Sequence, residues 1–147
     1  MPEVQDRTYW KRRSAEGREQ RFFRTATVQV KSAVDLDELK MGALADPAKF
    51  AIWPLRLMVP PHHAEWYRLS QLYKTVEKYR KLLILAPTDW GKSTVFNLCV
   101  PLYEIVKDRS IRIGMIGNNL DNTKQRFSTI KSHLTDNKDL IQAFGSK

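Results

Sequence analysis

The most informative stretch of the chain is Leu82-Leu83-Ile84-Leu85-Ala86-Pro87-Thr88-Asp89-Trp90-Gly91-Lys92-Ser93-Thr94. It opens with a short apolar run, and a turn-prone segment follows. Gly-Lys-Ser-Thr then leads into an apolar segment that is long enough for a helix. Gly-Lys-Ser within this order of strand, loop and helix predicts a phosphate-binding loop.

The residue types fit the chemistry of a triphosphate. Backbone N–H groups of a tight loop, together with the start of a helix, form an anion site. Gly91 allows close approach because it has no Cβ. Lys92 is expected to reach the β- and γ-phosphates of ATP, and the Ser93 hydroxyl to bind Mg²⁺. The predicted ATP phosphate-binding residues are Ala86, Pro87, Thr88, Asp89, Trp90, Gly91, Lys92, Ser93 and Thr94.

The match departs from the usual pattern, G-x-x-x-x-G-K-[ST], because its first position here is Ala86. The alternative interpretation is a chance Gly-Lys-Ser at a helix start in an unrelated αβ protein. The apolar run before the loop and the helix expected after it favour phosphate binding.

Composition is ordinary for one globular domain. The chain has 147 residues, of which 42% are hydrophobic and 28% charged. No apolar run approaches the roughly 18 residues that a membrane span needs, so we expect no membrane contact. Cys99 is the single cysteine, which excludes an internal disulfide and fits a reducing compartment. No Cys/His cluster has the spacing of a zinc site.

The net charge of +9 points to a polyanionic partner. Residues 1–60 hold 11 Lys/Arg against 8 Asp/Glu, and residues 61–147 hold 14 against 8, so the excess is spread along the chain. Such a surface either guides association with DNA or is only a solvated face. Aromatics among arginines in residues 1–24 allow the same two interpretations, and there we favour an arm that docks on protein.

The spacing of apolar residues and of turn residues predicts helices that alternate with short strands. We expect a short strand or linker at 25–30, helices at 36–44 and from Pro47 to Pro54, and a clear helix at 62–81. Residues 82–85 read as a buried strand, 94–106 as a helix kinked or divided at Pro101, and 111–117 as a second strand. A helix capped by Asn119 or Asp121 should run to Leu134, followed by a last turn from Asp136 to Gly145. This alternation predicts an α/β fold with a parallel sheet, and both Ala86–Lys92 and Gly117–Asn119 are expected at the carboxyl ends of its strands.

The ordered set of motifs resembles the ATPase domain of tailed-phage terminase large subunits. The resemblance rests on His62-His63-Ala64-Glu65-Trp66, on the loop Leu83–Thr94, and on Pro101-Leu102-Tyr103 and Phe144-Gly145 downstream. It covers about residues 60–147. It implies an incomplete P-loop NTPase sheet of the RecA/ASCE-like kind, preceded by a mostly helical segment. Residues 1–59 are then a basic arm and helical lead-in, and residues 60–147 are the N-terminal portion of the ATPase domain.

The resemblance also implies a function. Family members form a ring at the portal of an empty capsid and couple ATP hydrolysis to translocation of double-stranded DNA. The implied cofactors are ATP and Mg²⁺, and the implied partners are DNA, the portal protein, the small terminase subunit and further copies of the chain, in the host cytoplasm. Carried over by position, His62 and Trp66 lie in the region that approaches the adenine. Core packing is the simpler interpretation of Trp66.

Two departures weaken the transfer of catalysis. Many family members have an arginine in the loop where this chain has Thr88, and Asp89 follows where glycine or glutamine is usual. No segment has the four apolar residues followed by Asp-Glu that would supply the Mg²⁺ partner and the carboxylate that orients the attacking water. We therefore expect the N-terminal part of a longer protein, truncated before that motif and the nuclease domain, which alone lacks efficient hydrolysis.

Two other functions stay open. One is another P-loop NTPase, such as a helicase. The other is a non-catalytic basic module that binds nucleic acid or a partner. Ala86, Thr88 and Asp89 favour the module, whereas Lys92-Ser93 directly after Gly91 opposes it.

Overall fold

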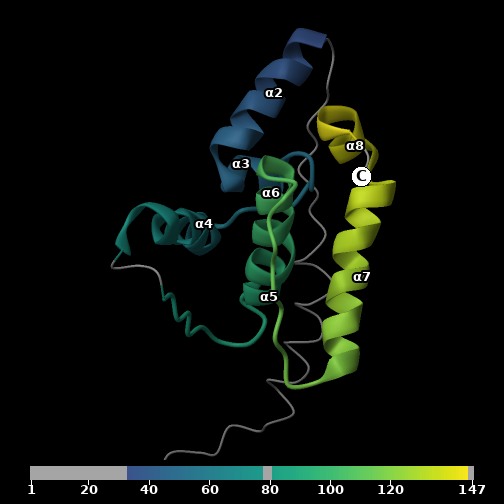
Figure 1. The fold of residues 1–147 in the computed structure, drawn as a ribbon. Coiled ribbons are helices and arrows are strands. Elements are labelled where there is room, and N and C mark those ends of the chain that lie inside the picture. Colours follow the sequence, from purple (N-terminus) through teal and green to yellow (C-terminus); the bar gives the residue numbers. More distant parts are fainter. Residues whose placement is uncertain (1–32, 78–80, 146–147) are drawn as a thin grey trace, which may run out of the picture.

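A computed structural model describes residues 33–77 and 81–145 of the chain (Figure 1). Its helices are α2 (Ala33–Ala45), α3 (Pro47–Ile52), α4 (Pro61–Thr75), α5 (Lys92–Thr94), the π-helix η2 (Val95–Cys99), α6 (Val100–Lys107), α7 (Leu120–Asp136) and α8 (Lys138–Phe144). The predicted strand at 25–30 and the N-terminal arm lie outside the described residues. No helix within those residues is long and apolar enough to cross a membrane.

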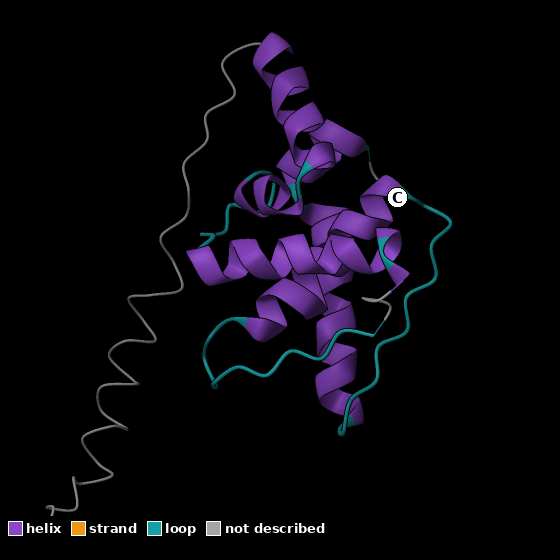
Figure 2. Ribbon diagram, turned by 90° about the vertical axis from the view of Figure 1, so that its left-hand side faces the viewer, coloured by secondary structure: helices purple, strands orange, loops and turns teal. Residues whose placement is uncertain are grey.

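The predicted fold class is wrong. Between residues 33 and 145, leaving out 78–80, every regular element is helical and no strand forms (Figure 2). The expected parallel P-loop sheet of the RecA/ASCE-like kind is therefore not the architecture. The runs at 82–85 and 111–117 are extended but unpaired. An apolar or alternating run specifies an extended conformation, whereas a sheet also needs a neighbouring strand to accept and donate the ladder hydrogen bonds.

Helix ends follow the capping residues of the sequence. The Asp46 side chain accepts a hydrogen bond from the N–H of Ala48, and Pro47 occupies the first turn of α3, as expected. Asn119 caps α7 through the N–H groups of Asp121 and Asn122. The last helix was predicted to start at Asp136, but α8 begins two residues later, at Lys138, because the Asn137 side chain caps it.

One continuous helical rod, α5–η2–α6, runs through the centre of the molecule (Figure 1). Its irregularity lies in the turn before Pro101, where the N–H of Val100 donates to the carbonyl of Val95, five residues back. Proline has no N–H to donate, and its ring crowds the carbonyl four residues earlier. A wide π turn relieves this crowding, so the predicted kink takes the form of a π segment rather than a break.

The core forms where the other helices pack on this rod. Phe50 and Tyr103 meet edge to face at 5.6 Å, and Phe144 lies 6.2 Å from Phe50. The Tyr103 hydroxyl donates to the carbonyl of Leu44 at 2.9 Å, which links α6 to the end of α2. The other large, fully buried side chains are Tyr67, Leu102, Leu140, Val95, Pro54 and Cys99.

An ion pair between a buried carboxylate and a partly exposed lysine joins α4 to α6. Glu104 is 3% exposed, its carboxylate accepts from the Lys74 ammonium, and the Gln71 amide donates to it at 3.2 Å. A buried carboxylate needs such partners, because desolvation without them is costly. The pair holds the C-terminal half of α4 against the central rod.

Candidate functional site

The predicted phosphate loop folds back on its own lysine. The Lys92 ammonium donates hydrogen bonds to the carbonyls of Ala86 and Pro87, so the beginning and the end of the loop meet at one cation. Asp89 at the loop tip has φ 64°, and Gly91 has φ 78°. Two left-handed residues so close together turn the chain sharply, and glycine adopts this conformation without steric cost.

The central rod begins directly after this turn. The N–H of Val95 donates to the Gly91 carbonyl at 3.0 Å and closes the first helical turn. The N–H groups of Lys92, Ser93 and Thr94, in the turn that Val95 closes, have no helical partner and form the positive end of the helix dipole. Ser93 is exposed, and within the described residues its hydroxyl makes no hydrogen bond. The arrangement offers a cation, unpaired N–H donors and a hydroxyl within three consecutive residues.

Helix α4 lies against the loop through His63, a residue to which the sequence analysis gave no role of its own and which it named only within the run His62–Trp66. The His63 side chain is 8% exposed, and its Nε2 lies 2.8 Å from the Trp90 carbonyl. A carbonyl accepts only, so Nε2 carries the proton. Burial lowers the pKa of His63, the hydrogen bond to Trp90 opposes that shift, and neighbouring His62 adds to it.

Rings from α4, the loop and the rod form one cluster. His63 stacks on Trp66 with centroids 5.3 Å apart, and His62 lies 5.0 Å from Trp90. Trp66 in turn lies 6.0 Å from Phe96 of η2. Trp90 is 48% exposed, so its ring forms the open edge of the cluster.

Of the two residues predicted on the adenine side, His62 lies beside the loop residue Trp90, whereas Trp66 contacts the two histidines and Phe96 of the rod. Trp66 also packs against the core, as its simpler interpretation requires. The other expected neighbour, Gly117–Asn119, is engaged elsewhere: Asn119 caps α7 and its carbonyl accepts from Thr123. The sheet edge that was predicted to bring this segment to the loop does not form.

Metal-binding residues are few near the loop. Across residues 33–77 and 81–145, no three His, Cys, Asp or Glu side chains form a group that would hold a metal. The hydroxyl of Ser93 fits Mg²⁺ that arrives with a nucleotide, because that ion takes most of its ligands from phosphate oxygens and water. Asp89, exposed at the loop tip, is the carboxylate that lies four positions before Ser93 in the sequence.

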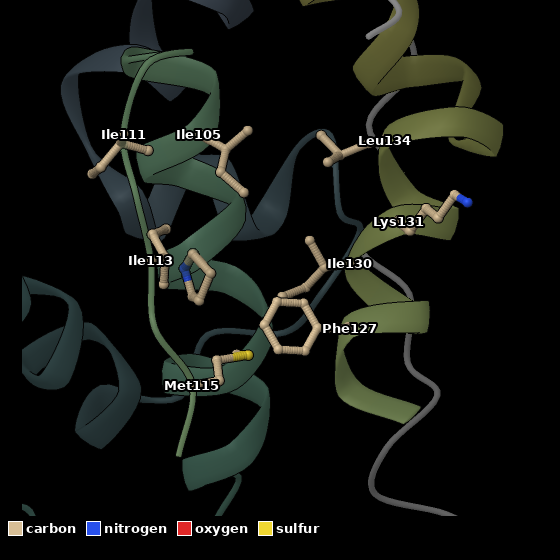
Figure 3. Close-up of a pocket in the computed structure, with 9 residues that line it drawn as sticks. Ile105, Ile111, Ile113, Met115, Phe127, Ile130, Lys131 and Leu134 are labelled. Carbon is tan, nitrogen blue, oxygen red and sulfur yellow. The ribbon is translucent and has the colours of Figure 1, made fainter. Parts of the chain in front are cut away.

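A second hollow lies away from the loop, between α6, α7 and the extended segment 111–115 (Figure 3). Its volume is about 280 Å³, and its lining is almost wholly apolar. Phe127, Ile130 and Leu134 of α7 face the extended segment, whereas the Lys131 side chain points away. The lining residues are Pro101, Ile105, Ile111, Ile113, Met115, Phe127, Ile130, Lys131 and Leu134. No nucleophile or acid–base pair lines it.

Cys99 is not a reactive thiol. It is 1% exposed beside Tyr67, and burial raises its pKa to about 12. The thiolate is the nucleophilic form, so this residue is a packing element of the core.

The chain was compared with models of protein families, with curated proteins and with solved structures, and it matches none of them. The case for a functional site in this loop therefore comes from the residues of this chain alone.

Proposed function

We propose that residues 86–94 bind the phosphates of ATP with Mg²⁺. The observation that carries this proposal is the closure of the loop on Lys92 immediately before the helical rod. A flexible lysine in an open loop would be one surface charge among many. Here the ammonium is held on the carbonyls of Ala86 and Pro87, and Lys92 itself begins the helix whose first N–H groups are free. An anion bound at this turn would gain from both the cation and the helix start.

Lys92, Ser93 and the start of the rod each have a donor or ligand atom that suits one part of Mg²⁺–ATP. The Lys92 ammonium would exchange a loop carbonyl for a phosphate oxygen, since charge-assisted hydrogen bonds to phosphate are stronger than those to neutral carbonyls. The N–H groups at the start of the rod would bind further oxygens, and Ser93 would bind Mg²⁺. The ring of Trp90 offers an exposed face for a nucleobase, with His62 beside it.

For the wider role, we propose the ATP-binding portion of a viral DNA-packaging motor of the terminase large-subunit kind. The ordered motifs of residues 60–147 support this, as does the net charge of +9, which suits a partner such as double-stranded DNA. The placement of His62 beside Trp90 of the loop, with Trp66 next to His62, supports the adenine-side role that the resemblance implies.

The second candidate is a non-catalytic basic module that binds nucleic acid or a protein partner. The all-helical architecture of the described residues favours it, because phosphate-binding loops of the Gly-Lys-Ser kind normally follow a strand. On this view Lys92 only stabilises the turn that starts the rod.

Calorimetry with Mg²⁺ and a non-hydrolysable ATP analogue separates the two. We expect binding by the unchanged chain, and an affinity about ten- to a hundredfold weaker in Lys92→Ala, the loss typical of one charge-assisted hydrogen bond. Lys124→Ala, which removes the same charge from an exposed position on α7, should bind normally. A folded chain that binds no analogue, or that binds equally well without Lys92, rules out the phosphate site.

A further inference from the structure

His63 occupies the space in which residue 91 would carry a side chain. A Cβ built on Gly91 would lie 2.4 Å from His63 Nε2 and 2.5 Å from its Cε1, far inside van der Waals contact. The His63 ring cannot withdraw freely, because it is buried and stacked on Trp66 at an interplanar angle of 29°. The glycine of the loop is therefore needed twice, for its φ of 78° and for the histidine beside it.

The same ring fixes one peptide plane of the loop. Its Nε2–H donates to the Trp90 carbonyl at 2.8 Å, so that oxygen points toward α4. In a trans peptide the carbonyl and the following N–H point in opposite directions. The Gly91 N–H is thereby turned away from α4. The next carbonyl, that of Gly91, accepts from Val95 and is also committed.

Helix α4 is itself anchored at some distance from the loop. The ion pair between Lys74 and the buried Glu104 holds its C-terminal half on α6, and Tyr67, 1% exposed, fills the core between. His63 thus projects from a helix that is fixed on the rod. A hydrogen bond from such a helix restrains the loop more than a bond from a mobile surface side chain would.

We propose that His63 is a positioning residue for the phosphate site, which it serves through the Trp90–Gly91 peptide without touching the nucleotide. The inference rests on the proposed function, because the Gly91 N–H is useful in this orientation only if an anion binds there. It adds a residue from outside the loop to the site and gives the α4 helix a role in binding. Loss of the Nε2 donor should let the peptide rotate and weaken phosphate binding, while the fold persists.

The test compares variants that keep or remove the donor. His63→Gln retains an N–H donor, His63→Leu retains bulk without a donor, and His63→Phe retains the ring without a donor. The matched control is His133→Leu, in which a second half-buried histidine, on α7, is replaced. For each folded variant, ¹H–¹⁵N NMR follows the amides of residues 90–94, and calorimetry gives the Kd of the Mg²⁺–ATP analogue.

We expect His63→Leu and His63→Phe to shift the Gly91 amide signal and to weaken Kd about three- to tenfold, the range of one ordinary hydrogen bond. His63→Gln should restore most of both, and His133→Leu should change neither. If Leu or Phe does not fold, the other carries the comparison. Normal binding in Phe with equal losses in Gln and Leu would mean that ring packing matters rather than the donor, and equal losses in all three would mean that an N–H donor does not suffice; either result would overturn the proposal.

The two proposals fail in different ways. If the unchanged chain binds no analogue, the phosphate function fails, whatever the NMR signals of the His63 variants show. If the unchanged chain binds and His63→Leu binds equally well with an unshifted Gly91 amide, phosphate binding stands and the role of His63 is overturned.

Discussion

At the scale of single residues, the loop depends on Gly91, which has φ 78° and has the ring of His63 where a Cβ would lie. Gly91, Lys92 and Ser93 are adjacent in the chain, so their spacing alone suggests a phosphate site. The need for glycine was predicted from close backbone approach, and the structure adds the ring of His63 as a second cause. That contact joins residues 28 positions apart, and no local sequence pattern predicts it. Trp66, three positions after His63, is the sequence feature that fits a packed histidine ring at this place on α4.

Substitution of Gly91 should be far more damaging than the same change in a helix. Gly91→Ala places a methyl group in a left-handed backbone and against His63, so we expect loss of loop structure and a lower unfolding midpoint in urea. The control is Gly42→Ala in α2, where the nearest atom to the new Cβ is Lys49 Cδ at 3.7 Å. That change should stabilise the chain by about 0.5–1 kcal/mol, because alanine favours helix. Similar midpoints for the two variants would contradict the described loop.

Because the pKa values of two histidines are lowered in the fold, we expect the free energy of unfolding to fall in mild acid. Burial is the main cause that lowers the pKa of both His63 and His133 below the ordinary value of 6.5. Below pH 6.5 the unfolded chain therefore binds protons that the folded chain does not, so the free energy of unfolding falls as pH decreases and levels off above 6.5.

Urea unfolding at several values between pH 5 and pH 8 measures this dependence. Replacement of either histidine by glutamine should reduce its slope. A slope that is the same in His63→Gln, in His133→Gln and in the unchanged chain would show that neither histidine titrates as described.

At the scale of elements, the starts of α3 and α7 were predicted well, whereas the helix predicted at 62–81 ends at Thr75 and the extended segments were predicted only in part. Caps and periodicity are local, so α3 and α7 begin where Asp46 and Asn119 indicate. The alternation of residues 111–117 is also real. Ile111, Ile113 and Met115 turn toward α6 and α7, and Ile116 is fully exposed. Alternation reports which side of an extended chain is covered. It does not supply a partner strand, and this is why the predicted sheet is wrong.

Removal of only one partner of the ion pair between α4 and α6 should lower the free energy of unfolding. Lys74→Ala leaves the buried Glu104 carboxylate without its cation, and we expect a loss of about 2 kcal/mol in the free energy of unfolding, because Lys74 is 34% exposed and Gln71 still donates to the carboxylate. The double change Lys74→Met with Glu104→Met removes both charges and should recover most of that loss. Urea unfolding measures both, and a double variant as unstable as the single one would contradict this ion pair.

At the scale of the whole molecule, burial is concentrated on the central rod and the extended run before the loop is left open. Leu83 and Leu85 are 80% and 85% exposed, although their apolar run was predicted to be a strand buried on both faces. An apolar run is equally compatible with a buried strand and with an exposed segment, so sequence alone does not decide. Val95, Leu102 and Leu140, by contrast, are apolar at helical spacing and buried.

Exposed leucines should affect association rather than stability. The double change Leu83→Ser and Leu85→Ser removes apolar surface from solvent contact and should alter the free energy of unfolding by less than about 0.5 kcal/mol. Light scattering at raised concentration should show less self-association. Leu102→Ser in the core is the comparison and should prevent stable folding. A large loss of stability in the Leu83/Leu85 variant would mean that this run is buried after all.

The most direct test of phosphate binding at Lys92 is an NMR titration of the ¹⁵N-labelled chain with Mg²⁺ and a non-hydrolysable ATP analogue, read at every amide. We predict the largest shifts at residues 86–94, with smaller shifts at His62 and His63 and almost none on α7 and α8. Shifts confined to basic surface positions, or no shifts in a folded chain, would contradict a nucleotide phosphate site in this loop.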